Sequence, residues 1–228
     1  MSEVLTTRVV GNVGIVEIDS PPVNALSTAV RAAVIEGLRI HNADDAVAAI
    51  VLLCAGRTFF AGADIAEFAD LPIKQPDFDA VMAAAESSAK PVIAAIHGTA
   101  LGGGLELALS CNYRVAVTSA KLGLPEVHLG ILPGAGGTQR LPRLIGAGPA
   151  LDMILGGNPV PAAKAAELGL VDRVVEDGKL EEAALAFAAE TLAQGGPWPR
   201  VRDKAVAGGL DDLEPVKAKY KRQFTGFK

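Results

Sequence analysis

The chain of 228 residues contains few of the residue types that mark several large protein classes. It has only two cysteines, Cys54 and Cys111, in apolar stretches without a pairing pattern, which is typical of a reducing compartment. Its three histidines, His41, His97 and His128, are too scattered for a usual histidine-based metal site. We therefore expect a cytoplasmic protein without a bound metal.

Long hydrophobic runs and excess positive charge are also missing. Stretches such as Val47–Ala55 are far shorter than the roughly 20 residues that a membrane-spanning helix needs. Met1–Arg8 has no basic segment followed by a long apolar core, so no secretory signal is expected. Lys and Arg number 21 against 26 Asp and Glu, which disfavours general nucleic-acid binding. We expect neither membrane nor nucleic acid as a partner.

Apolar residues make up 50% of the chain but aromatic ones only 4%, which indicates an aliphatic core. The length fits one domain with a small appendage. From Gly195 onward the composition becomes charged and rich in proline and glycine. We predict a main domain over residues 1–195 and a charged C-terminal segment over 196–228, either a truncated helical region or a linker.

The hydrophobic pattern predicts an α/β fold. A hairpin around Gly11-Asn12 comes first, and a helix capped by Ser27 or Thr28 follows. Beyond Gly130 the pattern predicts helices cut into short pieces by prolines, among them Pro142 and Pro149. Val47–Cys54 is a continuous apolar run, which predicts a strand buried on both faces. The other predicted strands are Pro91–Ile96, Tyr113–Thr118 and Val171–Val175. The other predicted helices are Asp77–Ala89, Leu105–Cys111 and Leu180–Leu192.

Common catalytic motifs are missing, including the Gly-x-Ser-x-Gly elbow, the His-Glu-x-x-His pair and the phosphate loop ending in Gly-Lys-Ser/Thr. Gly102-Gly103-Gly104 lacks the third glycine of a dinucleotide fingerprint, because Leu107 stands in its place. NAD binding is therefore not expected.

The same three glycines lie at the start of a predicted helix and leave backbone N–H groups uncovered, which favours an anion site. Glu106 follows two residues later among apolar neighbours. One interpretation is a charge at a helix terminus, and the other is a catalytic group with a raised pKa in an apolar pocket. The residues around Glu106 leave both open.

A second carboxylate, Glu126, lies among apolar and turn residues, where a returning strand could bring it beside Glu106. Two close carboxylates cannot both ionise easily, so such a pair supplies an acid and a base. The alternative is a solvated loop residue. Phe60–Asp64 and Pro133–Thr138 add two more segments with uncovered amides, and together these features indicate acyl or carbonyl chemistry. One such loop alone would indicate only an ordinary tight turn.

With these features the sequence resembles the enoyl-CoA hydratase/isomerase, or crotonase, superfamily. The resemblance covers most of the chain to about residue 195. It rests on segments in family order: Pro22–Leu26, Phe60–Ile65, Lys90–Gly98, Ala100–Ala108 and Leu124–Leu141.

The resemblance implies a spiral of ββα units with a helical C-terminal region. It also implies that the N–H groups of Ala63 and Gly103 form an oxyanion hole for the thioester oxygen of an acyl-CoA. Glu106 and Glu126 match the two glutamates of hydratases, and the N–H of Gly134 matches the group that holds the catalytic water. Residues matching the coenzyme A contacts are Ala25, Leu26, Ala61, Ala63, Asp64 and Ile65.

The implied reaction is hydration of a trans-2-enoyl-CoA to a 3-hydroxyacyl-CoA, with one glutamate activating water and the other supplying the proton for C2. No cofactor or metal is implied, because coenzyme A is part of the substrate. The alternatives are a Δ3,Δ2-enoyl-CoA isomerase, in which Glu126 moves the proton, another crotonase reaction such as thioester hydrolysis, and a non-catalytic fragment that binds coenzyme A.

The chain departs from the family at its C-terminal end. It stops at Lys228, where the family normally continues through helices that cover the acyl pocket and build trimers. If the chain is self-contained, the resemblance implies a homotrimer or hexamer. If it is the N-terminal part of a multifunctional β-oxidation enzyme, the resemblance implies a monomer or a fusion to a dehydrogenase part.

Overall fold

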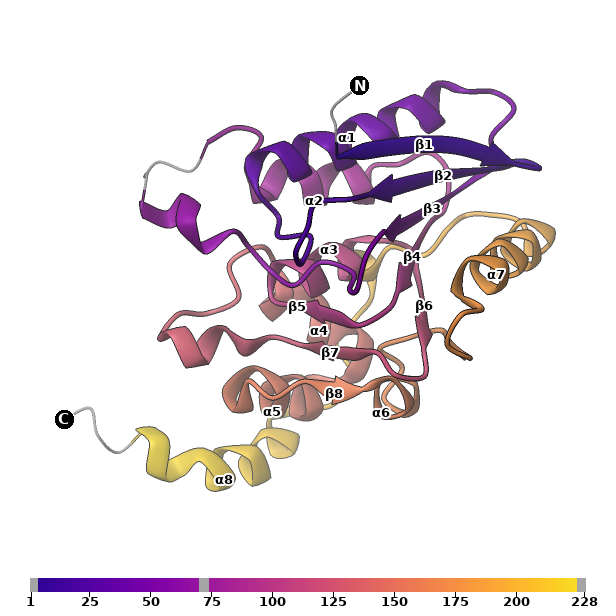
Figure 1. The fold of residues 1–228 in the computed structure, drawn as a ribbon. Helices are drawn as coiled ribbons and strands as arrows, with labels where there is room; N and C mark the ends of the chain where they lie inside the picture. Colours follow the sequence, from indigo (N-terminus) through magenta and orange to yellow (C-terminus); the bar gives the residue numbers. More distant parts are fainter. Residues whose placement is uncertain (1–3, 70–73, 225–228) are drawn as a thin grey trace.

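A computed structural model describes residues 4–69 and 74–224 and confirms the predicted α/β class (Figure 1). Its larger sheet has the strand order β1-β2-β3-β4-β6-β9, and its smaller sheet has the order β5-β7-β8. The strands are β1 (Leu5–Val10), β2 (Val13–Ile18), β3 (Ala49–Cys54), β4 (Val92–Ile96), β5 (Thr99–Leu101), β6 (Tyr113–Val117), β7 (Lys121–Gly123), β8 (Val160–Pro161) and β9 (Arg173–Val175).

Helices connect and cover these strands. The α-helices are α1 (Thr28–Ala43), α2 (Phe78–Glu86), α3 (Gly103–Ser110), α4 (Gly137–Ile145), α5 (Ala147–Gly156), α6 (Ala162–Glu167), α7 (Leu180–Gln194) and α8 (Glu214–Phe224). Four short 3-10 helices complete the described residues: η1 (Ile65–Ala69), η2 (Pro125–Leu129), η3 (Val201–Asp203) and η4 (Leu210–Leu213). None of the helices in these two ranges is both long and apolar enough to cross a bilayer.

The predicted hairpin is confirmed. β1 and β2 pair antiparallel, with Val10 opposite Val13 around a turn in which Gly11 has a φ of +61°. From β2 onward, each neighbouring pair of the larger sheet is parallel, which requires the helical crossovers between them.

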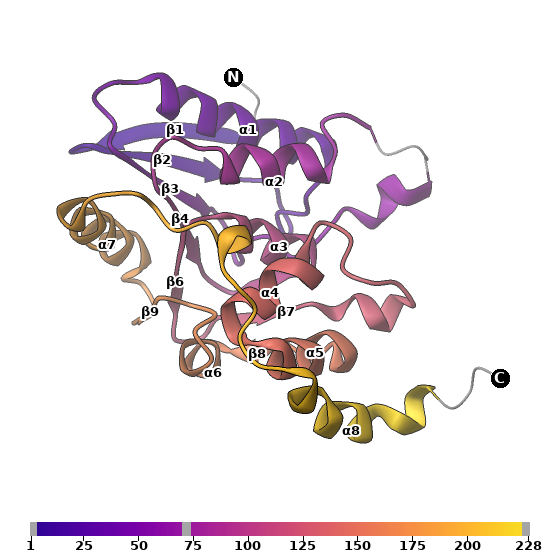
Figure 2. The ribbon, with the colours of Figure 1, turned by 180° about the vertical axis from the view of Figure 1, so that it is seen from behind.

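β3 is buried on both faces, as its continuous apolar run predicted. Ile50 and Leu52 belong to the core cluster that includes buried residues of α1 and α3. Val51 and Leu53 pack in a second cluster with residues of α7. α1 and α7 therefore cover opposite faces of the larger sheet, and both views show this arrangement (Figures 1 and 2).

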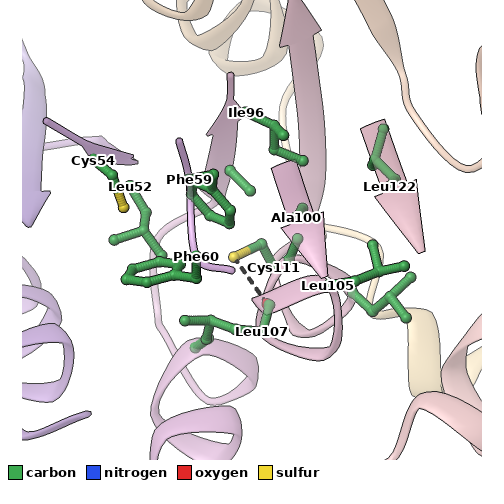
Figure 3. Close-up of a cluster of buried hydrophobic side chains, with 14 of the residues drawn as sticks. Leu52, Cys54, Phe59, Phe60, Ile96, Ala100, Leu105, Leu107, Cys111 and Leu122 are labelled. Atoms are coloured by element: carbon green, nitrogen blue, oxygen red, sulfur yellow. Dashed lines mark hydrogen bonds between the residues drawn. The ribbon is translucent and has the colours of Figure 1, made fainter. Parts of the chain in front are cut away.

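The core next to the glycine-rich turn is built by the side chains in Figure 3. Phe59 and Phe60 pack edge to face with ring centroids 4.6 Å apart. A Cβ on Gly104 would collide with the carbonyl oxygen of Phe60, so only glycine lets α3 approach this loop so closely. Cys111 donates its thiol to the carbonyl of Leu107 at 3.4 Å (Figure 3).

Helix starts follow local capping chemistry. The Ser27 side chain accepts from the N–H of Val30, and that of Asp77 accepts from Ala80, so both helices begin where the sequence predicted. The prediction that prolines cut the later helices is wrong for Pro142, which lies inside α4, and for Pro149, the third residue of α5. In the first turn of α5 the missing N–H has no helical partner to lose. In α4, proline removes only one potential bond, to Thr138.

The segment after residue 195 runs back along the body of the molecule (Figure 2). Asn112 donates to the carbonyl of Pro199 at 3.0 Å, and the N–H of Ala147 donates to Ala207 at 3.2 Å. Val201 is buried, and α8 packs against α5. These contacts join the C-terminal segment to the rest of the protein and do not test the domain boundary at residue 195, which stays a prediction.

Candidate active site

A cavity of about 350 Å³ lies where α3, η1, η2 and the loop before α4 meet. Its walls are mostly apolar, and two carboxylates reach it. The residues predicted for the site that line it are Ala61, Ala63, Ile65, Gly103, Glu106, Glu126 and Gly134.

Glu106 projects from the first turns of α3 and is 2% exposed. Its Oε1 atom accepts hydrogen bonds from the N–H groups of Ala135 and Gly137, each at 2.8 Å. Burial raises the pKa of Glu106, while these two bonds and the charge of Arg140 oppose the rise. The two bonds favour the ionised form of a carboxylate that is otherwise withdrawn from water.

Glu126 lies in the first turn of η2 and is 8% exposed. The alternative that it is a solvated loop residue is therefore wrong. Its Oε2 atom is buried without a hydrogen-bond partner in the described residues. Burial, aided by the negative charge of Glu106, raises the pKa of Glu126 to about 7.

The two glutamates thus share one cavity in different environments. Glu106 is held by two N–H donors, whereas Glu126 is left with an unpaired buried oxygen. A Cβ on Gly102 would lie 3.1 Å from Oε1 of Glu126, and one on Gly137 would lie 2.9 Å from Oε1 of Glu106. Glycine at these positions leaves room for both carboxylates. The two carboxylates therefore differ in the groups that stabilise their ionised forms.

Ala63 and Gly103, the two residues of the predicted oxyanion hole, both line the cavity. Gly103 is the first residue of α3, so its N–H has no acceptor within the helix. A Cβ on Gly103 would lie 3.7 Å from the nitrogen of Ala63. Ala63 is held in place by its bridge to Leu26, whose N–H donates to Gly62 at 2.8 Å. The nitrogen of Ala63 and the first residue of α3 therefore lie close together on the cavity wall.

The residues matching the coenzyme A contacts divide into two groups. Ala61, Ala63 and Ile65 line the cavity. Leu26 is fully buried behind Ala63. The side chain of Asp64 accepts from the N–H of Ala66 at 3.1 Å and starts η1. Leu26, Asp64 and Ala25 are absent from the cavity lining.

Sequence reasoning missed the residues that hold Glu106. Ala135 and Gly137 lie in the stretch Pro133–Thr138 with its uncovered amides, but spacing alone does not show which carboxylate these amides bind. It also missed that Leu129, Ile131 and Leu132 form an exposed apolar rim to the cavity. In the part of the chain that the structure describes, His, Cys, Asp and Glu side chains form no cluster suited to a metal ion.

Comparison with known proteins agrees with this fold. The family model described as enoyl-CoA hydratase/isomerase matches residues 8–222. The chain belongs to this family, and the predicted crotonase-type fold is confirmed.

Some similar proteins are named for one activity, and others are named as bifunctional enzymes. The chain is 44% identical over 185 residues to a probable enoyl-CoA hydratase of Bacillus subtilis (strain 168), covering 78% of this chain and 72% of the relative. It is 49% identical over 183 residues to the peroxisomal bifunctional enzyme of Danio rerio, covering 80% of this chain. It spans only 25% of that relative's length.

A solved structure of an enoyl-CoA hydratase from Bacillus anthracis superposes with a TM-score of 0.78. That protein is 40% identical to this chain, and the alignment covers 86% of this chain and 78% of the other. Identity at this level supports transfer of the fold.

Proposed function

We propose that the protein is an enoyl-CoA hydratase that adds water to a trans-2-enoyl-CoA and yields a 3-hydroxyacyl-CoA. The observation that carries the proposal is the pair of buried carboxylates, Glu106 and Glu126, on one cavity with different surroundings. The names of the Bacillus relatives also support it.

In the proposed reaction, Glu106 is the base. Its carboxylate is fixed by the N–H groups of Ala135 and Gly137, and its free oxygen accepts a proton from water as that water attacks C3. The N–H of Gly134, on the cavity wall, helps to hold this water. Glu126 is the acid, because a pKa of about 7 keeps a proton available for C2 near neutral pH.

The N–H groups of Ala63 and Gly103 stabilise the negative charge on the thioester oxygen between these two proton transfers. Removing one such donor typically costs about 3 kcal/mol of transition-state stabilisation. The apolar walls exclude water and strengthen both hydrogen bonds. Two neighbouring segments, Ala25–Leu26 and Ala61–Ile65, are proposed to contact the coenzyme A part of the substrate through Ala25, Leu26, Ala61, Ala63, Asp64 and Ile65.

A second candidate is Δ3,Δ2-enoyl-CoA isomerisation. It is favoured by one observation: Glu126, with its pKa near 7 and an unpaired oxygen, can take a proton from one carbon and return it to another. This reaction needs no attacking water and therefore no base at Glu106. Thioester hydrolysis and binding of coenzyme A without catalysis are further outcomes of the test.

The test offers crotonyl-CoA and a 3-enoyl-CoA to wild-type protein and to Glu106→Gln and Glu126→Gln. Hydration predicts a product of crotonyl-CoA that is heavier by one water, and a loss of about 100-fold or more in kcat for each variant. Isomerisation of the 3-enoyl-CoA that survives Glu106→Gln but not Glu126→Gln indicates the second candidate. Binding of coenzyme A without turnover of either substrate would contradict both.

The proposed partner is the acyl-CoA substrate, with no cofactor or metal. We propose a cytoplasmic location, supported by two buried, unpaired cysteines and by bacterial relatives. For assembly, we propose either a monomer or a part of a longer chain fused to a dehydrogenase part, or a homotrimer or hexamer. The chain spans only a quarter of the bifunctional relative, which supports the longer chain. Size-exclusion chromatography with light scattering separates a monomer from those assemblies.

A further inference from the structure

An ion pair lies behind the loop that holds Glu106. Glu86, the last residue of α2, is nearly buried, and its Oε1 atom accepts from Nε of Arg140 on α4 at 2.7 Å. The side chain of Arg140 is 13% exposed. Arg202, from η3, reaches the other oxygen of Glu86 at 3.2 Å and is 62% exposed. Three elements distant in sequence therefore meet at one carboxylate.

Arg140 also reaches the loop itself. Its Nη1 atom donates to the carbonyl oxygen of Ala135 at 2.8 Å, while the N–H of Ala135 donates to Oε1 of Glu106 at 2.8 Å. A Cβ on Gly136, which has a φ of +96°, would collide with Nη1 of Arg140. The glycine therefore provides both the turn and the space for the guanidinium.

We propose that Glu86 and Arg140 are a positioning pair that fixes the Ala135–Gly137 loop, and through it the carboxylate of Glu106. The inference rests on the proposed hydratase function. Neither residue lines the cavity, so neither is a catalytic residue. Their effect passes through the loop and does not require contact with substrate.

The geometry supports this role over a purely structural one. The guanidinium bonds the carboxylate of Glu86 through one nitrogen and the Ala135 carbonyl through another, so it fixes the loop relative to α2. α2 also carries Phe78, which lines the cavity. A small shift of the loop moves two donors of Glu106 together, and misplacement of about 1 Å at a catalytic group can cost about 100-fold in rate.

The pKa of Glu106 is a readout that a change in overall stability would not move. The charge of Arg140 lowers the pKa of Glu106, whereas Asp79 on α2 raises it. Glu126 on η2 is the other carboxylate that interacts electrostatically with Glu106. Replacing Arg140 by a neutral residue while the two carboxylates stay unchanged therefore raises the pKa of Glu106.

The test compares Arg140→Gln, Arg140→Lys and Glu86→Gln with a matched control, Arg173→Gln. Arg173 pairs with Glu190 through two bonds of 2.9 and 2.6 Å, away from the cavity lining. We expect Arg140→Gln to lower kcat for crotonyl-CoA by about 10- to 100-fold while KM changes less than about threefold. Arg140→Lys should recover part of that loss, and Arg173→Gln should leave kcat unchanged.

The second readout does not need turnover. NMR of protein labelled at the glutamate carboxyl carbons, with the Glu106 signal assigned from Glu106→Gln, should show a higher pKa for Glu106 in Arg140→Gln. A folded Arg140→Gln protein with wild-type kcat and an unchanged Glu106 pKa would overturn the proposal.

If Arg140→Gln does not fold, Glu86→Gln decides the matter, because it leaves Arg140 in place. A reduced kcat at unchanged KM supports the positioning pair, and wild-type kcat overturns it. If wild-type protein does not hydrate crotonyl-CoA, the proposed function fails, while the NMR titration still tests the pair.

Discussion

The Oε1 atom of Glu106 lies 2.8 Å from the backbone nitrogen of Gly137 and joins the start of α3 to the start of α4 across 31 residues. The same oxygen accepts from Ala135. One carboxylate oxygen therefore uses two uncovered amides of a second glycine-rich segment. Glu126, in the same cavity, has no comparable support in the described residues.

This asymmetry predicts a bell-shaped dependence of kcat/KM on pH. As pH rises through about 7, Glu126 loses the proton that it must donate, so the rate falls. As pH falls through the raised pKa of Glu106, the base becomes protonated and the rate falls again. Hydration of crotonyl-CoA measured from about pH 5 to 9 checks this, with the two limbs belonging to the coupled pair. A flat profile between pH 6 and 8 would contradict it.

We expect full activity to require glycine at residue 102, because a side chain there would crowd the carboxylate of Glu126. Gly102→Ala places a Cβ 3.1 Å from Oε1 of Glu126 at a φ of +49°, so we expect kcat to fall about 10-fold or more. Gly178→Ala is the control, because Gly178 has a φ of +82° with no atom within 4 Å of the added Cβ. Both residues have a positive φ. Equal kcat values in the two would show that the contact with Glu126 is unimportant.

We expect the buried carboxyl group of Glu126 to lower the free energy of unfolding at high pH, where it is ionised. Burial raises the pKa of Glu126 from 4.5 to about 7, so the folded state binds the proton more tightly than the unfolded chain. The stabilisation that this tighter proton binding gives to the folded state is complete below about pH 4.5 and is lost as pH rises through 7. At pH 8, Glu126→Gln removes a buried charge and should raise Tm by about 2–4 °C, a gain of roughly 1 kcal/mol.

The measurement is thermal unfolding of wild type and Glu126→Gln at pH 5 and pH 8. At pH 5 the wild-type carboxyl is largely protonated, so the two proteins should differ little. Glu190→Gln, at an exposed side chain, is the control for the loss of a charge. A Tm difference that is the same at both pH values would contradict the prediction.

Much of the fold follows from local signals in the sequence. The apolar run of β3 predicted burial on both faces, because alternate residues face α1 on one side and α7 on the other. The cap at Ser27 predicted the start of α1. The first turn of α3 was harder, because helix propensity disfavours Gly103 and Gly104, yet the close approach to Phe60 requires a glycine at residue 104.

The site was predictable in part. Glu106 and Glu126 stand out as carboxylates in apolar surroundings, and both reach one cavity. The residues around them could not be assigned, because Ala135 contributes only its backbone and Arg140 resembles any charged residue of a surface helix. The link from Arg140 to Glu86 spans 54 residues and depends on how α2 and α4 pack, which no local pattern encodes.

The most direct test of the two-glutamate account is hydration of crotonyl-CoA in isotope-labelled water, followed by mass analysis of the acyl-CoA. The account predicts one labelled oxygen in the wild-type product, and rates lower by about 100-fold or more in both Glu106→Gln and Glu126→Gln. Unlabelled acyl-CoA from wild-type protein, or wild-type rates in both variants, would contradict it.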